Sequence, residues 1–351
     1  MKVNNNIEIL SRLCYNKTKT VKAVYRMKIG NTELKHGLML APMAGFTDRG
    51  MRVVARNMGA EYLVTEMVSA KAVVYKDEKT HALARILPDE TPCAVQIFGS
   101  EPSVMAEAAK TLSAGEEGGV PPVAIDINMG CPVHKIFSNG EGSALMKSPE
   151  LILDIVRSVK DATPLPVTVK IRAGIDGEHI NAVECALAAE EGGACLVAVH
   201  GRTRVEMYSG KADREIIKKV KERLHIPIIA NGDVTSGEDA LMMLQKTGAD
   251  GIMVGRGAIG NPFIFAEITA ALEGREYTQP TLCERIDTAL LQLRIAVGEK
   301  GEGCAVREAR KQIALYLHSF RGASRIRTEI NRAESYAEVE SALMSALSEN
   351  L

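Results

Sequence analysis

Eight short apolar runs, rich in β-branched residues, recur between residues 38 and 255 and constrain the fold more than any other feature. They cover residues 38–42, 62–66, 94–98, 123–128, 167–172, 195–200, 226–230 and 251–255. The segments between them, such as 102–113, 149–161, 179–191 and 212–224, are rich in Ala, Glu and Lys and favour helices. Eight strands that alternate with helices are typical of a (β/α)8 barrel, an α/β fold. An open doubly wound sheet is the alternative, but it usually has fewer strands and a glycine fingerprint that this sequence lacks.

The chain changes character after residue 280. Residues 281–351 show helical spacing with no β-rich run, and glycines interrupt them at 301–303 and at Gly322. We therefore predict a barrel domain over residues 27–278 and a smaller all-helical domain over residues 279–351. Residues 1–26 match no element of a barrel. They are either a basic, disordered arm or an over-extended start, with Met27 as the true first residue.

The carboxyl ends of the predicted strands are unusually polar, and barrel enzymes carry their chemistry at those ends. Alternation along the fourth run places Asp126 and Asn128 on one face, and alternation along the fifth directs Lys170 and Arg172 into the lumen. Cations in a lumen are costly unless an anion or an electron-rich ligand meets them. A buried ion pair with Asp126 or Glu66 is the alternative explanation. Other polar strand ends are Gln96 and His200-Gly201-Arg202.

The last two predicted strands end in glycine turns, Ala-Asn-Gly-Asp at 230–233 and Val-Gly-Arg-Gly at 254–257. Small residues let backbone N–H groups approach an anion, and barrels commonly bind phosphate after strands seven and eight. A phosphate at this edge, with amide, lysine and histidine groups toward the centre, suits flavin mononucleotide (FMN). Its pyrimidine edge would meet Gln96 and Lys170, where a lysine stabilises the anionic reduced ring.

Several segments, in this order along residues 36–265, resemble the tRNA-dihydrouridine synthases. They are LAPMAGFTD, VQIFGSEP, DINMGCPVHKI with GSALM, VTVKIR, VHGRTR with YSG, IIANGDV and GIMVGRGAIGNPFIF. The tail YLHSFRGASRIRTEIN resembles the helical domain of the bacterial B-type branch of that family.

The resemblance implies a role for each matching residue. The flavin ring would lie along Pro42, Met43 and Ala44, with Gln96, Lys170 and His200 at its polar edges. The ribityl chain and phosphate would be held by Asn231, Gly232, Asp233, Gly255 and Arg256. The substrate would contact Asn128, Arg172 and Arg202, and Cys131 would be the proton donor.

The implied reaction reduces the C5–C6 double bond of a uridine in tRNA to 5,6-dihydrouridine, with NADPH reducing the flavin. C6 is electron-poor because it is conjugated to the C4 carbonyl, so hydride adds there and a proton must reach C5. A thiol with a pKa of about 8.5 is protonated at neutral pH and can donate that proton. Cys131 lies between Gly130 and Pro132 at a strand end, where it could reach a base that has been flipped out of its stack. Uridines of the D-loop are the expected substrates, and the sequence leaves open which of them is modified.

The formal net charge of −1 does not indicate a nucleic-acid partner, but basic residues gather in two segments. One is residues 1–28, and the other is the Arg-rich segment 303–332. Guanidinium groups bind phosphate in bidentate fashion, so Arg321, Arg325 and Arg327 are predicted to contact the tRNA backbone. A solvated face, or ion pairs with Glu308 and Glu329, is the alternative.

Seven cysteines without paired spacing, and without a CxxC or Cys/His set, argue against a disulfide framework and a zinc site. No apolar run reaches signal-peptide or membrane-spanning length. We therefore expect a cytoplasmic monomer with no metal, no membrane and no obligate protein partner.

Two other functions stay open. A flavin reductase of the dihydroorotate or dihydropyrimidine dehydrogenase kind would share the barrel and FMN, but the Arg-rich tail argues against it. An RNA-binding module without catalysis is the other, and the presence of Cys131, Lys170 and His200 argues against it.

Overall fold

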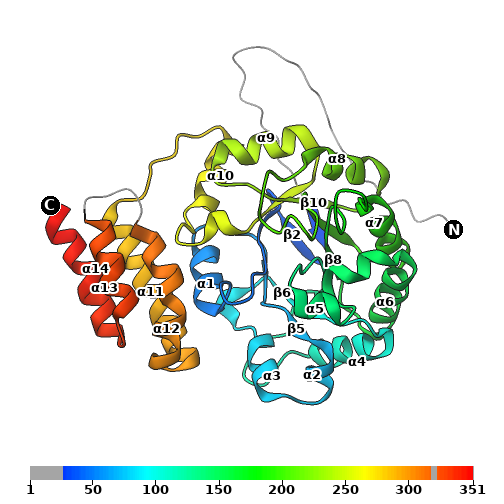
Figure 1. Cartoon of the computed structure of the whole chain (residues 1–351), viewed down its shortest axis with the longest axis horizontal. Coiled ribbons are helices and arrows are strands. Elements are labelled where there is room, and N and C mark those ends of the chain that lie inside the picture. Colours follow the sequence, from blue (N-terminus) through cyan, green and yellow to red (C-terminus); the bar gives the residue numbers. More distant parts are fainter. Residues whose placement is uncertain (1–26, 318–321, 351) are drawn as a thin grey trace, which may run out of the picture.

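A closed barrel of parallel strands forms the larger part of the chain (Figure 1). The computed structural model describes residues 27–317 and 322–350. The strands are β3 (Leu38–Leu40), β4 (Leu63–Val64), β6 (Cys93–Phe98), β7 (Ile125–Met129), β8 (Val167–Arg172), β9 (Leu196–His200), β10 (Ile228–Asn231) and β11 (Gly251–Val254), and the short β5 (Val68–Ser69) also pairs with β6. A parallel bridge between Met39 and Tyr62 joins the first two strands and closes the barrel. The predicted (β/α)8 fold is therefore confirmed.

Helices surround the barrel on its outside (Figure 1). They are α1 (Arg49–Asn57), α2 (Ala70–Val74), α3 (Glu78–Ala84), α4 (Pro102–Leu112), α5 (His134–Ser138), α6 (Pro149–Ala162), α7 (Ala182–Glu191), α8 (Arg214–Arg223), α9 (Gly237–Thr247) and α10 (Ile264–Glu273). Several begin at a side chain that accepts a backbone N–H of the first turn, as Asp48 does for α1 and Ser148 for α6. Such N-caps satisfy donors that the helix itself leaves unpaired.

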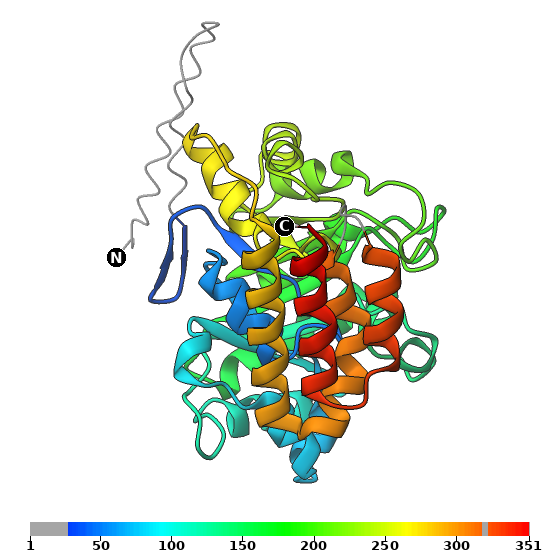
Figure 2. The same ribbon diagram turned by 90° about the vertical axis from the view of Figure 1, so that its left-hand side faces the viewer.

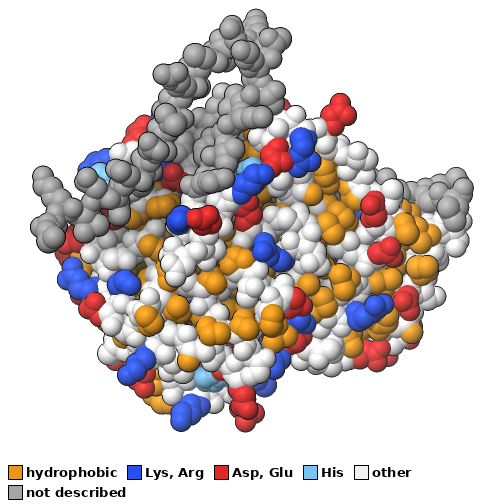
Figure 3. All heavy atoms as spheres, turned by 180° about the vertical axis from the view of Figure 1, so that it is seen from behind, with side chains coloured by type: hydrophobic (Ala, Val, Ile, Leu, Met, Phe, Trp, Pro, Cys, Tyr) orange, Lys and Arg blue, Asp and Glu red, His pale blue; other side chains and the backbone are white. Residues whose placement is uncertain are grey.

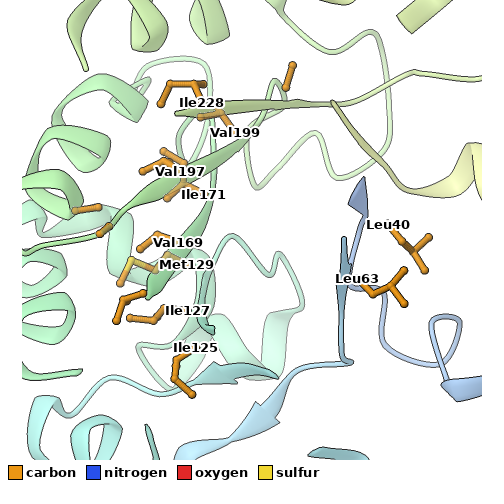
Figure 4. Packing of buried hydrophobic residues seen from close by; sticks show 14 of the residues in the cluster. Leu40, Leu63, Ile125, Ile127, Met129, Val169, Ile171, Val197, Val199 and Ile228 are labelled. Atoms are coloured by element: carbon orange, nitrogen blue, oxygen red, sulfur yellow. The ribbon is translucent and has the colours of Figure 1, made fainter. Parts of the chain in front are cut away.

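The largest hydrophobic core lies between the strands and these helices. Alternate residues along each strand point outward and are fully buried beneath the helices. Figure 4 shows this row on three neighbouring strands, with Ile125, Ile127 and Met129 of β7, Val169 and Ile171 of β8, and Val197 and Val199 of β9. The residues between them point into the lumen, as the alternation predicted.

A short hairpin that the sequence did not predict packs against the lumen of the barrel. Its strands β1 (Met27–Ile29) and β2 (Thr32–Leu34) pair antiparallel. Met27, Ile29 and Leu34 are buried in one cluster with apolar lumen residues such as Met39 and Tyr62. The hairpin therefore fills this part of the lumen with side chains.

The last described helices form a separate bundle, which Figure 2 shows side by side. They are α11 (Leu282–Lys300), α12 (Glu302–Ile313), α13 (Ala323–Arg332) and α14 (Tyr336–Asn350). Their own hydrophobic core contains Ile286, Leu293, Tyr316 and Leu343. This bundle is the all-helical part that the sequence predicted after the barrel.

The helical bundle packs closely against α1 of the barrel (Figure 1). A Cβ atom at Gly50 would lie 2.4 Å from the backbone oxygen of Gln292, so only glycine permits this approach. The Lys300 ammonium lies 2.8 Å from the Asp48 carboxylate. Gln312 Nε2 donates to the Gly45 carbonyl at 3.4 Å. The bundle therefore contacts the loop between β3 and α1.

The outer surface carries charges of both signs. Basic and acidic side chains lie interspersed on the face shown in Figure 3. Among the helices of residues 27–317 and 322–350, none is both long and apolar enough to cross a membrane.

Candidate active site

A pocket of about 710 Å³ lies at the carboxyl ends of the barrel strands. Every residue predicted to be catalytic or to bind the cofactor lines it, as do two of the predicted substrate residues. They are Pro42, Met43, Ala44, Gln96, Asn128, Cys131, Lys170, Arg172, His200, Asn231, Gly232, Asp233, Gly255 and Arg256. The strand order that closes the barrel brings these residues together from seven strand ends.

Lys170 carries a charge into this pocket without a partner of its own. Within the described residues its ammonium makes neither a hydrogen bond nor an ion pair, so the alternative of a buried pair with Asp126 or Glu66 is not observed. Burial, followed by the charge of Arg172, lowers the pKa of Lys170 to about 8. Both effects favour the neutral amine, and a ligand that accepts a hydrogen bond would reverse them.

Asp126 bonds to its strand neighbours instead of to Lys170. Its Oδ1 accepts from Thr168 Oγ1, and its Oδ2 accepts from Gln96 Nε2 at 2.6 Å. Gln96 Oε1 in turn accepts from Asn128 Nδ2 at 2.9 Å. Asn128 Oδ1 accepts from the backbone N–H of Cys131 at 2.9 Å. A continuous chain of hydrogen bonds therefore joins the lumen to the loop that follows β7.

Cys131 lies on that loop and is held at its backbone. Ser143 donates to the Cys131 carbonyl twice, from its N–H at 3.1 Å and from its Oγ at 2.8 Å. Gly142 adopts a φ of 60°, and a Cβ there would lie 3.0 Å from Cys131 Cβ, so glycine fits best. Burial raises the pKa of the Cys131 thiol above its ordinary value. The thiol is therefore protonated at neutral pH and can act as an acid.

His200 is a neutral imidazole in this environment. Burial, and after it the charges of Lys170, Arg172 and Arg202, lower the pKa of His200 to about 2. Its Nε2 lies 3.4 Å from Arg202 Nη1. A neutral ring at the pocket wall can donate or accept one hydrogen bond without adding charge.

Arg202 is placed differently from the expected substrate contact. It is 1 % exposed and does not line the pocket. Its Nη2 donates to the Asp233 carboxylate and to the Gly210 carbonyl, each at 2.8 Å, and its Nε donates to the Ser209 carbonyl at 2.8 Å. With these donors engaged, Arg202 supports Asp233 and the loop after β9 from beneath the pocket.

The two glycine turns leave little space beside their backbones. Gly232 has a φ of 128°, and a Cβ there would lie 2.6 Å from the Ala212 Cβ. At Gly257 a Cβ would lie 2.2 Å from the Val234 carbonyl oxygen. Both turns thus require glycine. Because glycine has no side chain, the backbone N–H groups of these turns can approach an anion in the pocket.

Several lining residues were not predicted from the sequence. They are Phe46, Met67, Met207, Tyr208, Thr235 and Ile259. Tyr208 lies at the pocket with Arg256 4.6 Å and Arg172 5.9 Å from the centre of its ring. An exposed aromatic residue in the Tyr-Ser-Gly turn was the signal that could have identified it.

Two of the three predicted tRNA-contacting arginines, Arg325 and Arg327, lie on α13 of the helical bundle rather than at the pocket. Arg321 lies outside the described residues. Arg325 forms an ion pair with Glu329, and Arg327 Nε donates to the Ala323 carbonyl at 3.1 Å. Arg325 and Arg327 are two residues apart and point about 160° apart around α13, because each residue turns a helix by about 100°. They therefore face different sides of α13, and the ion pair with Glu329 that was given as the alternative is present for Arg325.

The residues that line the pocket have the chemistry of a flavin site. Its unpaired ammonium, amide groups and glycine turns match a ligand with a polar ring edge and a phosphate, and Met43 and Met253 add apolar wall. Among the described residues there is no group of three or more His, Cys, Asp or Glu side chains that could hold a metal.

A closed barrel with a polar pocket at the carboxyl ends of its strands is the architecture of the (β/α)8-barrel enzymes. One solved structure with a similar fold is histamine dehydrogenase from Rhizobium sp. 4-9, with a TM-score of 0.53 and 14% identity. The match covers 78% of this chain and 51% of that one, and it shows the fold alone.

Sequence comparisons identify the family. Residues 39–351 match the family model described as dihydrouridine synthase. The chain is 41% identical to tRNA-dihydrouridine synthase B of Shewanella oneidensis, over 89% of this chain and 95% of the relative. It is 40% identical to a probable tRNA-dihydrouridine synthase of Rickettsia conorii, over 87% and 91%. The chain belongs to the dihydrouridine synthase family of flavin oxidoreductases, which confirms the predicted resemblance.

Proposed function

We propose that this enzyme reduces uridines of tRNA to 5,6-dihydrouridine, with FMN bound in the pocket and NADPH as the source of electrons. The observation that carries the proposal is the meeting of an unpaired lysine, two glycine turns and a protonated thiol in one pocket. Relatives named tRNA-dihydrouridine synthase support tRNA as the substrate.

The pocket residues divide into those that would hold FMN and those that would meet the uridine. Pro42, Met43 and Ala44 would line the ring, with Gln96, Lys170 and His200 at its polar edges, and Asn231, Gly232, Asp233, Gly255 and Arg256 would hold the ribityl chain and phosphate. When bound, FMN supplies the hydride that reduces the base at C6. Lys170 would keep its proton and place a positive charge beside the ring.

The substrate side of the reaction depends on Asn128, Arg172 and Cys131. Hydride addition at C6 generates negative charge that is shared with the C4 carbonyl of the uracil. Cys131 would then donate its thiol proton to C5, and the resulting thiolate would regain a proton from solvent. Arg172 and the free N–H of Asn128 would orient the base. Arg202 would act as a positioning residue for Asp233 rather than as a substrate contact.

The helical bundle is the proposed tRNA-binding region. We assign it residues 279–351, with Arg325 and Arg327 among the basic side chains that would meet the tRNA backbone. The cysteines of the described residues are free, which supports function in a reducing cytoplasm.

The direct test combines purified protein, FMN and NADPH with unmodified tRNA and measures dihydrouridine at each uridine. Formation of dihydrouridine at defined positions supports the proposal. Turnover of free uracil or orotate in its place would favour a small-molecule reductase, and tRNA binding by a colourless, inactive protein would favour an RNA-binding module.

A further inference from the structure

The hydrogen-bonded chain beneath the pocket spans three neighbouring strands. Asp126 lies on β7, Gln96 on β6 and Thr168 on β8, and the chain returns through Asn128 to the loop after β7. Asp126 is 3 % exposed, Gln96 is fully buried and Asn128 is 8 % exposed. The folded protein loses considerable stability when one of these buried polar groups is left without a hydrogen-bond partner.

The donors and acceptors at its two ends fix the direction in which the hydrogen bonds of this network run. The backbone N–H groups of Gly130 and Cys131 can only donate, so they require the carbonyl oxygen of Asn128, at 3.2 and 2.9 Å. The amide nitrogen of Asn128 must then face Gln96 Oε1, and Gln96 Nε2 must face an acceptor. Asp126 Oδ2 supplies that acceptor. Asp126 at one end, and the backbone N–H groups of Gly130 and Cys131 at the other, therefore favour the same orientation of both amides.

We propose that Asp126 and Gln96 are positioning residues that set the orientation of Asn128 and thereby hold the Cys131 loop over the pocket. Gln96 would have this role in addition to its place at the pocket wall. The value of this arrangement to catalysis rests on the proposed role of Cys131 as proton donor. The direction of these hydrogen bonds does not depend on that role, and it can be tested without measuring catalytic turnover.

This hydrogen-bonded network also explains why residue 126 is an aspartate rather than an uncharged residue. Asp126 forms no ion pair with Lys170, and its direct contacts are with Thr168 and Gln96. A carboxylate accepts from Thr168 and from Gln96 at once, and it cannot donate to Gln96 when ionised. An asparagine could point either of its two groups at Gln96, which would leave the direction of the chain less firmly set.

The test reverses the direction of the hydrogen bonds that link residues 126, 96 and 128. Asn128→Asp places acceptors at both ends of the Gln96 amide, which has only one NH2 group, so one contact becomes repulsive. Adding Asp126→Asn restores every contact in the opposite direction. The new amide at 126 donates to Gln96 Oε1, and Gln96 Nε2 donates to the carboxylate at 128, which still accepts from Gly130 and Cys131.

Two measurements on the flavin-loaded variants report the result, namely the thermal midpoint and the deuterium exchange of the backbone amides of residues 129–131. Asn128→Asp should lower the midpoint by about 2–6 °C and speed exchange in this segment about tenfold or more. Asp126→Asn/Asn128→Asp should regain at least half of both losses, although each single change alone is neutral or harmful.

Asp126→Leu/Asn128→Asp is the matched control, because leucine removes the charge at 126 but cannot donate to Gln96. It should not rescue Asn128→Asp. Equal rescue by leucine, or no rescue by asparagine, would overturn the proposal. If Asn128→Asp alone fails to fold, recovery of folded, flavin-bound protein only in the asparagine double variant carries the same information. Failure of the proposed reaction would appear separately, as absent dihydrouridine in the wild type.

Discussion

Lys170 and Asp126 lie on adjacent strands of the barrel, yet they do not pair with each other. Asp126 is satisfied by Gln96 and Thr168, whereas the Lys170 ammonium faces the pocket without an acceptor. Its lowered pKa is therefore a property of the protein before a ligand arrives. A ligand that prefers the charged amine must supply the interaction that burial removed.

We expect the affinity of the apoprotein for FMN to depend on pH through Lys170. The charged form binds, and its pKa is about 8 in the free protein, so affinity should be full below about pH 7 and weaken as pH rises above 8. Lys170→Met should bind more weakly and show a flatter profile between about pH 6.5 and 9. Fluorescence titration of FMN measures both the affinity and its pH profile.

Lys147→Met is the control, since Lys147 lies outside the pocket lining, over the Phe137 ring. An equal slope in wild type and Lys170→Met would contradict the assignment.

Among the elements, the turns after β10 and β11 are packed closely against each other. The Gly257 backbone packs against the Val234 carbonyl, so the turn after β11 is held against the turn after β10. A phosphate-binding surface built in this way depends on the separation of two backbones rather than on a single side chain.

Gly257→Ala should force these two turns apart. The added methyl group would lie 2.2 Å from a backbone oxygen that cannot move alone, so we expect a loss of about 1–3 kcal/mol in the free energy of unfolding, together with weaker FMN binding. Gly298→Ala is the control, because Gly298 is a position in α11 with no atom within 4 Å of its added Cβ. That change should stabilise the helix slightly. Denaturant unfolding of both variants checks the prediction, and an unaffected Gly257→Ala protein would refute it.

The sequence predicted the elements that repeat and the residues that alternate. Period-two alternation correctly directed Lys170 and Arg172 inward, because a closed barrel leaves only two directions for a side chain. It could not predict that Asp126 bonds Gln96, since this contact depends on the register between β6 and β7. The burial of Arg202 was missed for the same reason, because its acceptors lie on other loops.

At the scale of the whole molecule, the helical bundle contacts the barrel beside the pocket. Gln312 donates a hydrogen bond to the Gly45 carbonyl, and Lys300 pairs with Asp48, so the helical bundle contacts the loop that carries Pro42–Ala44. The sequence predicted the bundle from its helical spacing. It gave no indication of this contact, which depends on Gly50 permitting α11 to approach α1.

If the bundle binds tRNA, replacing Arg321, Arg325 and Arg327 with Ala should weaken tRNA affinity and flatten its salt dependence. The slope of log affinity against log salt should fall by up to about one for each phosphate that is no longer neutralised. The contribution of Arg325 should be reduced by its pair with Glu329. Binding across a salt series measures the effect, with Lys218→Ala on α8 of the barrel as the control. Flavin content should not change, and an unchanged affinity and slope would place the tRNA elsewhere.

The central claim is that Cys131 protonates a uridine held in the flavin pocket, and one comparison tests it most directly. Dihydrouridine formation in unmodified tRNA should be measured for wild type, Cys131→Ala and the control Cys304→Ala, whose thiol lies on α12 outside the pocket. Cys131→Ala should retain its flavin and its oxidation of NADPH but lose about 10²–10⁴-fold in dihydrouridine formation, as expected for the loss of a general acid. Cys304→Ala should match the wild type. Near-normal dihydrouridine formation by flavin-loaded Cys131→Ala would contradict the account.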